Sequence, residues 1–120
     1  MDIEIKKDNW QKFFKGFREK NHLRPVRLEV FDDTGTQTEV NVLPFNGIDL
    51  DLKGEDSPVV NLSFGDERAN GRHLSHNINK VNLISLKVDD YGNDEVLELE
   101  NDAKAKTLLI FEQLPEIGSD

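Results

Sequence analysis

Two histidines near the middle of the chain are the residues whose types and spacing come closest to a chemical site. His73 and His76 lie three residues apart in the stretch RHLSHNI, and imidazole nitrogen is a common ligand of zinc and related metals. A metal site needs further ligands, and Asp66 or Glu67 is the candidate for a third. This interpretation predicts a metal-binding protein, or a metal-dependent hydrolase, centred on the two histidines.

The same two histidines also admit an ordinary structural role. On a strand, an odd separation places the side chains on opposite faces, roughly 10 Å apart along the chain at 3.3 Å per residue. A helix that would align them is not expected, because Ser75, Asn77 and Asn79 surround them in a short stretch. We favour a hydrogen-bonding pair that organises a loop between two strands. On this interpretation the chain has no catalytic residue and no cofactor.

The motifs of several common enzyme classes are missing from the sequence. There is no Gly-x-Gly-x-x-Gly, no phosphate-binding Gly-Lys-Ser/Thr loop, no Gly-x-Ser-x-Gly and no His-Glu-x-x-His. The chain has no cysteine, which excludes disulfides, thiolate nucleophiles and cysteine–zinc sites and favours the reducing cytoplasm. We therefore predict a non-catalytic binding or interaction module.

The charge of the chain is uneven and bears on its partners. The net charge is −9, yet residues 1–30 contain eight basic and five acidic residues, whereas residues 31–120 contain seven and nineteen. An acidic body repels phosphate backbones, so nucleic acid is not an expected partner. No apolar run reaches the ~20 residues of a membrane helix or forms the core of a signal peptide. We expect a cytoplasmic protein without a membrane span.

The first element that the sequence predicts is an amphipathic helix. Asp8-Asn9 offers an N-cap, and four aromatic residues follow at the spacing i, i+3, i+4, i+7: Trp10, Phe13, Phe14 and Phe17. Such a stripe normally faces the core of a globular domain. Gly16 lies beside the stripe, and Asn21 and Pro25 end the helix.

From residue 26 onward the pattern changes to the two-residue period of strands. Apolar residues alternate with charged ones in about seven short segments that are separated by turn residues. We expect one of these turns at Asn46-Gly47, the dipeptide that best tolerates a type I′ hairpin. The fold class is α+β, with the N-terminal helix packed on a strongly curved, mainly antiparallel sheet or small barrel of about seven strands.

The length of 120 residues suits a single domain with one hydrophobic core. We expect this domain to occupy residues 1–112, with residues 113–120 as a loose C-terminal tail. No internal repeat or linker divides the chain.

Several stretches together resemble an uncharacterised bacterial family that is known only as a domain of unknown function. The resemblance rests on Trp10 to Phe17, Leu43 to Gly54, Gly65-Asp66, His73 to Ile78 and Glu95 to Phe111. It would cover nearly the whole chain. It implies a small soluble bacterial domain and brings no known activity with it.

The predicted helix is also the best candidate for a surface that binds a partner. Lys12, Lys15 and Arg18 flank its aromatic stripe, and a basic amphipathic helix can dock on a membrane surface or in a partner's groove. We expect the partner to be a protein, including a second copy of the chain that pairs through an exposed strand edge. A barrel that holds an apolar ligand is a third possibility, and it would require a cavity.

Overall fold

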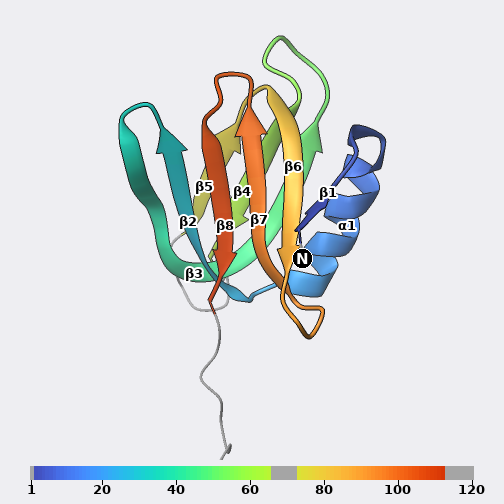
Figure 1. Cartoon of the computed structure of the whole chain (residues 1–120), viewed down its shortest axis with the longest axis vertical. Coiled ribbons are helices and arrows are strands. Elements are labelled where there is room, and N and C mark those ends of the chain that lie inside the picture. The colour runs from blue at the N-terminus through green and yellow to red at the C-terminus, as the bar shows by residue number, and fades with distance from the viewer. Residues whose placement is uncertain (1, 66–72, 113–120) are drawn as a thin grey trace, which may run out of the picture.

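A computed structural model describes residues 2–65 and 73–112, which form one α-helix beside an eight-stranded antiparallel sheet (Figure 1). The sequence predicted this α+β architecture and about seven strands. The elements in chain order are β1 (Asp2–Glu4), a short 3₁₀ turn (Lys7–Asn9), α1 (Trp10–Asn21), β2 (Pro25–Asp32), β3 (Gly35–Asp51), β4 (Val59–Phe64), β5 (Leu74–Ile78), β6 (Val81–Val88), β7 (Asp94–Asn101) and β8 (Lys106–Phe111).

The strand order in the sheet is β1-β6-β7-β8-β2-β3-β4-β5, and every neighbouring pair is antiparallel. The sheet is strongly curved but does not close into a barrel, because β1 and β5 remain at its two edges. The long strand β3 produces most of the curvature. Its first part pairs with β2, and its second part pairs with β4. In Figure 1, β4 and β5 consequently lie behind the other strands.

Our prediction of a hairpin turn at Asn46-Gly47 is wrong, because β3 runs through both residues without reversing. The register with β4 shifts between Phe45 and Gly47, which marks a bulge at the dipeptide, and a second irregularity lies upstream at Val42, whose φ is 31°. An extra residue in a strand bends it and increases its twist. The dipeptide therefore helps to turn one strand between two parts of the sheet.

The sheet has eight strands where we predicted about seven, and two of the eight, β1 and β5, were not predicted. β1 is only three residues long, and β5 contains the stretch LSHNI that we expected to be a loop. β5 forms because each of its residues pairs with one of β4, from Leu74 opposite Phe64 to Ile78 opposite Val60. Residues 113–120, predicted to be a tail, lie outside the described residues.

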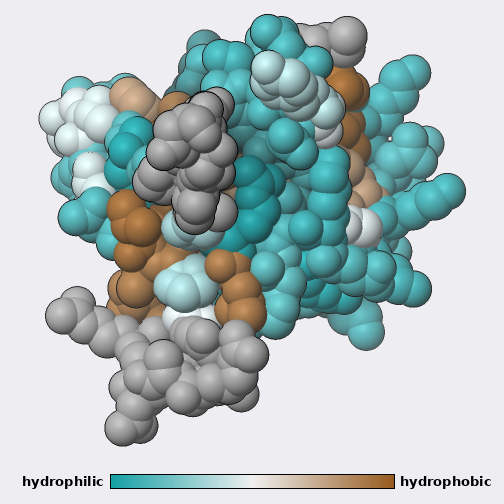
Figure 2. All heavy atoms as spheres, turned by 90° about the horizontal axis from the view of Figure 1, so that it is seen from below, coloured by the Kyte–Doolittle hydropathy of each residue, from teal (hydrophilic) through white to brown (hydrophobic). Residues whose placement is uncertain are grey.

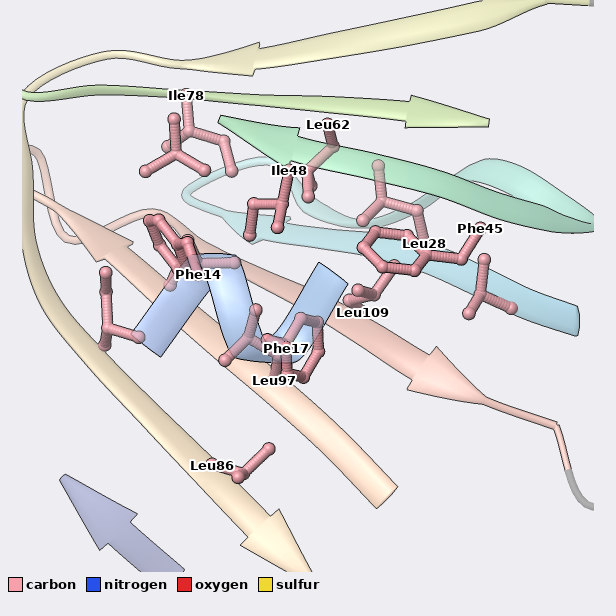
Figure 3. Close-up of a cluster of buried hydrophobic side chains, with 14 of the residues drawn as sticks. Phe14, Phe17, Leu28, Phe45, Ile48, Leu62, Ile78, Leu86, Leu97 and Leu109 are labelled. Carbon is pink, nitrogen blue, oxygen red and sulfur yellow. The ribbon is translucent and has the colours of Figure 1, made fainter. Parts of the chain in front are cut away.

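The hydrophobic core fills the concave side of the sheet, and α1 contributes three of its largest side chains (Figure 3). Trp10, Phe14 and Phe17 are buried, as the spacing of the stripe predicted, whereas Phe13 is only partly buried. The ring of Phe17 lies 5.7 Å from the rings of both Phe45 and Phe111, measured between centroids. Aromatic burial of this kind contributes roughly 2–3 kcal/mol per ring. The helix is therefore part of the core.

The position of α1 creates two flanks along its length. One flank faces the second part of β3, and the other faces β1 and the adjoining strand β6. In the view of Figure 3, α1 lies between β6 and β7 on one side and β3 and β4 on the other. Across residues 2–65 and 73–112, no helix is long and apolar enough to cross a membrane.

Candidate functional site

The flank of α1 that faces β3 is held by direct hydrogen bonds. Arg18 Nη1 donates to the Asp49 carboxylate at 2.8 Å and to the carbonyl of Ile48 at 3.3 Å. Just beyond the helix, backbone bonds of 2.7 and 2.9 Å join residues 23 and 24 to Phe45. The space left on this flank is a recess of about 140 Å³. The helix is thus fixed closely against β3.

The opposite flank of α1 is open and forms a groove of about 820 Å³. Its walls come from β1 with the residues after it, from the exposed side of α1, and from β6 and the start of β7. The lining residues are Ile3, Glu4, Ile5, Lys6, Asn9, Lys12, Phe13, Gly16, Phe17, Lys20, Leu86 and Asp94. Figure 2 shows a narrow apolar strip on the helix side of the molecule, at the right, between hydrophilic side chains. We call this feature the α1–β1 groove.

Hydrogen bonds close both ends of the α1–β1 groove. At one end, the indole Nε1 of Trp10 donates to the carbonyl of Ile5 at 2.8 Å. At the other end, the buried Asn21 donates from Nδ2 to the Asp94 carboxylate at 2.8 Å. Lys20 Nζ lies 3.3 Å from the same carboxylate, and Arg24 donates to the Asn21 side chain at 2.7 Å. Because both ends are anchored, α1 is held beside β1 without filling the space between them.

The outer edge of β1 presents backbone hydrogen-bonding groups to the groove. Ile3 pairs with Leu86, and Ile5 donates its backbone N–H to the carbonyl of Ile84 at 2.8 Å. In an antiparallel ladder the residue between two such hydrogen-bonded positions directs its N–H and C=O away from its partner strand. Glu4 is that residue. No backbone partner of Glu4 on its outer side occurs among the described residues.

Gly16 leaves open space on the side of α1 that lines the groove. A Cβ built on Gly16 would meet no atom within 4 Å, so the missing side chain leaves open space. Lys12 and Lys20 lie four residues to either side and therefore share its row along the helix surface. The backbone of a ligand could approach α1 closely at this point.

The charged side chains that line the groove differ in whether they form an ion pair. Lys20 is paired with Asp94. Lys6 and Lys12 form no ion pair within the part of the chain that the structure describes, and Glu4 is the other acid of the lining. Among the lining residues, two unpaired lysines thus outnumber one unpaired acid, although the chain as a whole has a net charge of −9.

Residues 1–118 match the family described as Family of unknown function (DUF5335). The chain belongs to this family. No curated protein and no solved structure matches it. The resemblance inferred from the sequence motifs is therefore confirmed as membership in a family of unknown function, and DUF5335 brings no activity to the α1–β1 groove.

The three basic residues predicted for partner binding are divided between the flanks of α1 in this DUF5335 chain. Lys12 lines the α1–β1 groove, whereas Lys15 and Arg18 line the small recess beside β3. Lys20, which also belongs to the basic side of the predicted helix, lines the groove as well, whereas Lys6 was not singled out from the sequence. The i, i+4 spacing of Lys12, Gly16 and Lys20 was a signal for part of this wall.

The histidines of the predicted metal site occupy different settings. His73 is exposed just before β5, whereas His76 is partly buried within β5, opposite Leu62. Leu62 is fully buried, and directly paired residues share a face, so the imidazole of His76 points toward the core side. Burial lowers the pKa of His76, and the nearby Glu39 carboxylate opposes this shift.

The metal interpretation is not tested by these positions alone. Asp66 and Glu67, the candidates for a third ligand, lie outside the described residues. Within residues 2–65 and 73–112, no group of three or more His, Cys, Asp or Glu side chains is placed to hold a metal ion. The site at His73, His76 and Asp66 stays a prediction from the sequence.

Proposed function

We propose that this DUF5335 chain is a non-catalytic binding module and that a segment of a partner protein occupies the α1–β1 groove. The observation that carries the proposal is the groove itself, a space of about 820 Å³ with a mainly apolar lining between an edge strand and a helix. Binding sites of small ligands typically have volumes of about 300–1,000 Å³ and apolar linings with a few polar groups, and the groove falls in this range.

The exposed apolar side chains at the groove support a binding role. Ile3 is 41% exposed although it is a large hydrophobic residue, and its neighbours Phe13 and Ile5 are only partly buried. Covering this surface with a partner would contribute about 25 cal/mol per Å² of apolar area. The anchored ends of α1 support a preformed site, which lowers the ordering cost of binding.

Peptide selection tests this proposal directly. Random twelve-residue peptides displayed on phage are selected against the intact chain and then compared on three variants. Gly16→Leu places a side chain in the groove, Gly16→Ala tests the loss of glycine without filling it, and Gln11→Leu adds the same leucine on the β3 flank.

We expect peptides that bind the native chain, Gly16→Ala and Gln11→Leu but lose binding at least tenfold, about 1.4 kcal/mol, on Gly16→Leu. Thermal unfolding of each variant verifies that it is folded. Failure to enrich any peptide, or equal binding to Gly16→Leu, contradicts the proposal.

A further inference from the structure

We infer that the partner segment extends the sheet as a strand beside β1 and that two basic side chains of this segment, separated by a hydrophobic one, lie beside Asp2 and Glu4. This inference rests on the proposed function, because it names the binding mode and the chemistry of the segment in the α1–β1 groove. Strand addition to an exposed sheet edge is a common mode of peptide recognition, in which main-chain bonds supply affinity and side-chain contacts supply specificity.

The outer edge of β1 carries backbone groups that an added strand would satisfy. The outward N–H and C=O of Glu4 lie between positions at Ile3 and Ile5 that pair with β6. Asp2 lies two residues from Glu4, so its backbone groups point the same way. An extended segment alongside β1 would pair with these groups, whereas an apolar ligand without a peptide backbone would not.

The length of α1 limits how much of the segment lies beside it. α1 has twelve residues, which correspond to a length of about 18 Å at 1.5 Å per residue. An extended segment rises about 3.3 Å per residue, so about five residues fit beside the helix. Gly16 lies in the middle of this length, where its open space lets a second backbone approach α1.

One face of the added strand would lie over the groove. Ile3 pairs with Leu86, which is buried on the core side of the sheet. Paired residues of neighbouring strands share a face, so alternate side chains of the segment would lie beside Ile3 and over Phe13. Ile3 is 41% exposed, and covering it removes apolar surface from water. This set of side chains should therefore be hydrophobic.

The other face of the added strand would lie beside two carboxylates. Asp2 and Glu4 alternate with Ile3 along β1, so their side chains point to the face of the sheet opposite the core. Both residues are exposed, and neither forms an ion pair within residues 2–65 and 73–112. Basic side chains in this set would gain a partner, whereas acidic ones would be repelled.

The neighbouring strands add negative charge to the same face. Ser85 of β6 lies between Glu4 and Glu98 of β7, so the two carboxylates share a face. Lys87 of β6 offsets part of this charge, but its ammonium group lies 4.0 Å from a third carboxylate, that of Glu95. Opposite charge favours association and suppresses wrong partners, so this face selects a basic set.

The unpaired lysines of the groove lie away from this set. Lys12 belongs to α1, across the groove from β1, so it meets the hydrophobic set. Its aliphatic stem covers apolar surface while its ammonium group stays in water. Lys6 follows β1 in the chain and lies beyond Glu4. The segment therefore needs a basic side chain beside each carboxylate of β1 and none beside Lys6.

Defined five-residue peptides test this chemistry. The probe is capped Val-Lys-Val-Lys-Val, and three capped controls each change one feature. Val-Glu-Val-Glu-Val reverses the charge, Lys-Lys-Val-Val-Val keeps the composition without the alternation, and the probe with N-methyl groups on alternate backbone nitrogens loses strand hydrogen bonds. Affinity for the intact chain is measured by NMR titration, which also follows the backbone amide signal of Glu4.

We expect Val-Lys-Val-Lys-Val to bind and to shift the Glu4 amide signal. Each of the three controls should bind about tenfold more weakly or worse, because each loses the charge match, the separation of the two faces or the main-chain bonds. The clustered peptide carries the same charge as the probe, so it measures the attraction of any cationic peptide to a chain of net charge −9.

A charge exchange on the protein supplies the second test. Glu4→Lys should weaken binding of the lysine peptide about tenfold and strengthen binding of the glutamate peptide. The matched Glu39→Lys makes the same change at an exposed position of β3, which four strands separate from β1, and should alter both affinities less than twofold. Thermal unfolding verifies each variant, and Asp2→Lys replaces Glu4→Lys if the latter does not fold.

The outcomes separate the inference from the proposed function. Equal binding of the glutamate, clustered or N-methylated peptide overturns the inference, and so does an equal effect of Glu4→Lys and Glu39→Lys. If peptides selected on phage bind the groove but none of the defined peptides does, the inference fails and the proposed function stands. If no peptide of either kind binds, both fail.

Discussion

The flank of α1 that faces β3 and the flank that faces β1 differ in how the helix is held along its length. Toward β3, Arg18 in the second half of the helix bonds directly to the strand, and the space left is about 140 Å³. On the other flank, the hydrogen bonds among the described residues lie near the two ends of the helix, to Ile5 and to Asp94, and the space is about 820 Å³. One flank attaches the helix to the sheet, and the other leaves a surface for binding.

The difference follows from a few side chains on one helix. Phe17 and Phe14 direct their rings into the core, whereas Phe13 lies at the margin of the groove. Gly16 contributes nothing to the packing on the open side. A domain whose helix packed equally on both flanks would bury more apolar surface and be more stable, so the open flank is consistent with use as a binding site.

The largest expected effect concerns Phe17, whose ring is buried in the core, compared with Phe13, whose ring lies at the margin of the groove. Phe17→Ala should lower the free energy of unfolding by about 3–5 kcal/mol, because a buried ring is replaced by a cavity. Phe13→Ala should cost roughly 1–2 kcal/mol, because its ring is only partly buried. Urea denaturation followed by Trp10 fluorescence measures both changes.

Equal losses for the two variants would mean that the groove flank is packed as tightly as the core, which would break the comparison. If Phe17→Ala does not fold, Phe17→Leu provides a milder substitution, with an expected cost of about 1–2 kcal/mol.

The second prediction concerns the anchor at the Asn21 end of the groove. Asn21→Leu should destabilise the fold by about 1–3 kcal/mol, because the buried Asp94 carboxylate and Arg24 each lose a hydrogen-bonding partner. The same variant should weaken peptide binding, since it releases the helix at one end of the groove. Chemical denaturation and peptide calorimetry measure the two effects.

A double-mutant cycle with Asp94→Leu supplies the control. Residues that contact each other couple by about 0.5–3 kcal/mol, so the double variant should lose less stability than the sum of the single variants. Strict additivity would show that the Asn21–Asp94 bond does not anchor the helix.

Much of the packed side of the fold could be predicted from the sequence because its signals are local. The spacing of Trp10, Phe13, Phe14 and Phe17 predicted both the helix and its inward stripe. The alternation of apolar and charged residues predicted most of the strands. Each of these patterns lies within a single helix or strand. The apolar residues of each pattern are then buried against those of the neighbouring elements in one core.

The open side of the fold could not be predicted in the same way because it depends on contacts between distant segments. β1 is only three residues long, and its partner is β6, more than eighty residues away. Asn46-Gly47 has the local chemistry of a turn, yet pairing with β4 keeps it within β3. A groove between α1 and β1 exists only once both elements have found their places.

The candidate residues show the same division. Lys12 was singled out from the sequence and lines the groove, but Lys15 and Arg18 belong to the other flank. The sequence does not indicate which flank of α1 each basic residue occupies, because it does not show where β1 and β3 lie relative to the helix. The strand containing His76 was missed because its polar residues give no alternation, and pairing with β4 supplies the order instead.

The third prediction compares two glycines, one on each flank. Gly16→Ala should stabilise the fold by about 0.8–1 kcal/mol, because alanine is the better helix former and its Cβ meets open space. Gly47→Ala on β3 should give no gain or a loss, because its Cβ would lie 3.1 Å from Ser63 Oγ. Thermal unfolding of the two variants distinguishes these outcomes. A gain at Gly47 or a loss at Gly16 would reverse the assignment of the open and closed flanks.

The smallest effect is expected for the basic residues of the helix. Arg18→Ala should lower the free energy of unfolding by about 0.2–1 kcal/mol, because the Arg18–Asp49 pair is partly exposed. Lys12→Ala should change stability by less than about 0.5 kcal/mol, since Lys12 has no ion partner among the described residues. The loss at Arg18 should shrink in high salt, because surface charges are screened, whereas Lys12→Ala should stay insensitive to salt. Urea titrations at low and high sodium chloride measure both, and a Lys12 variant that loses as much stability as the Arg18 variant would show that Lys12 holds the helix instead of serving the groove.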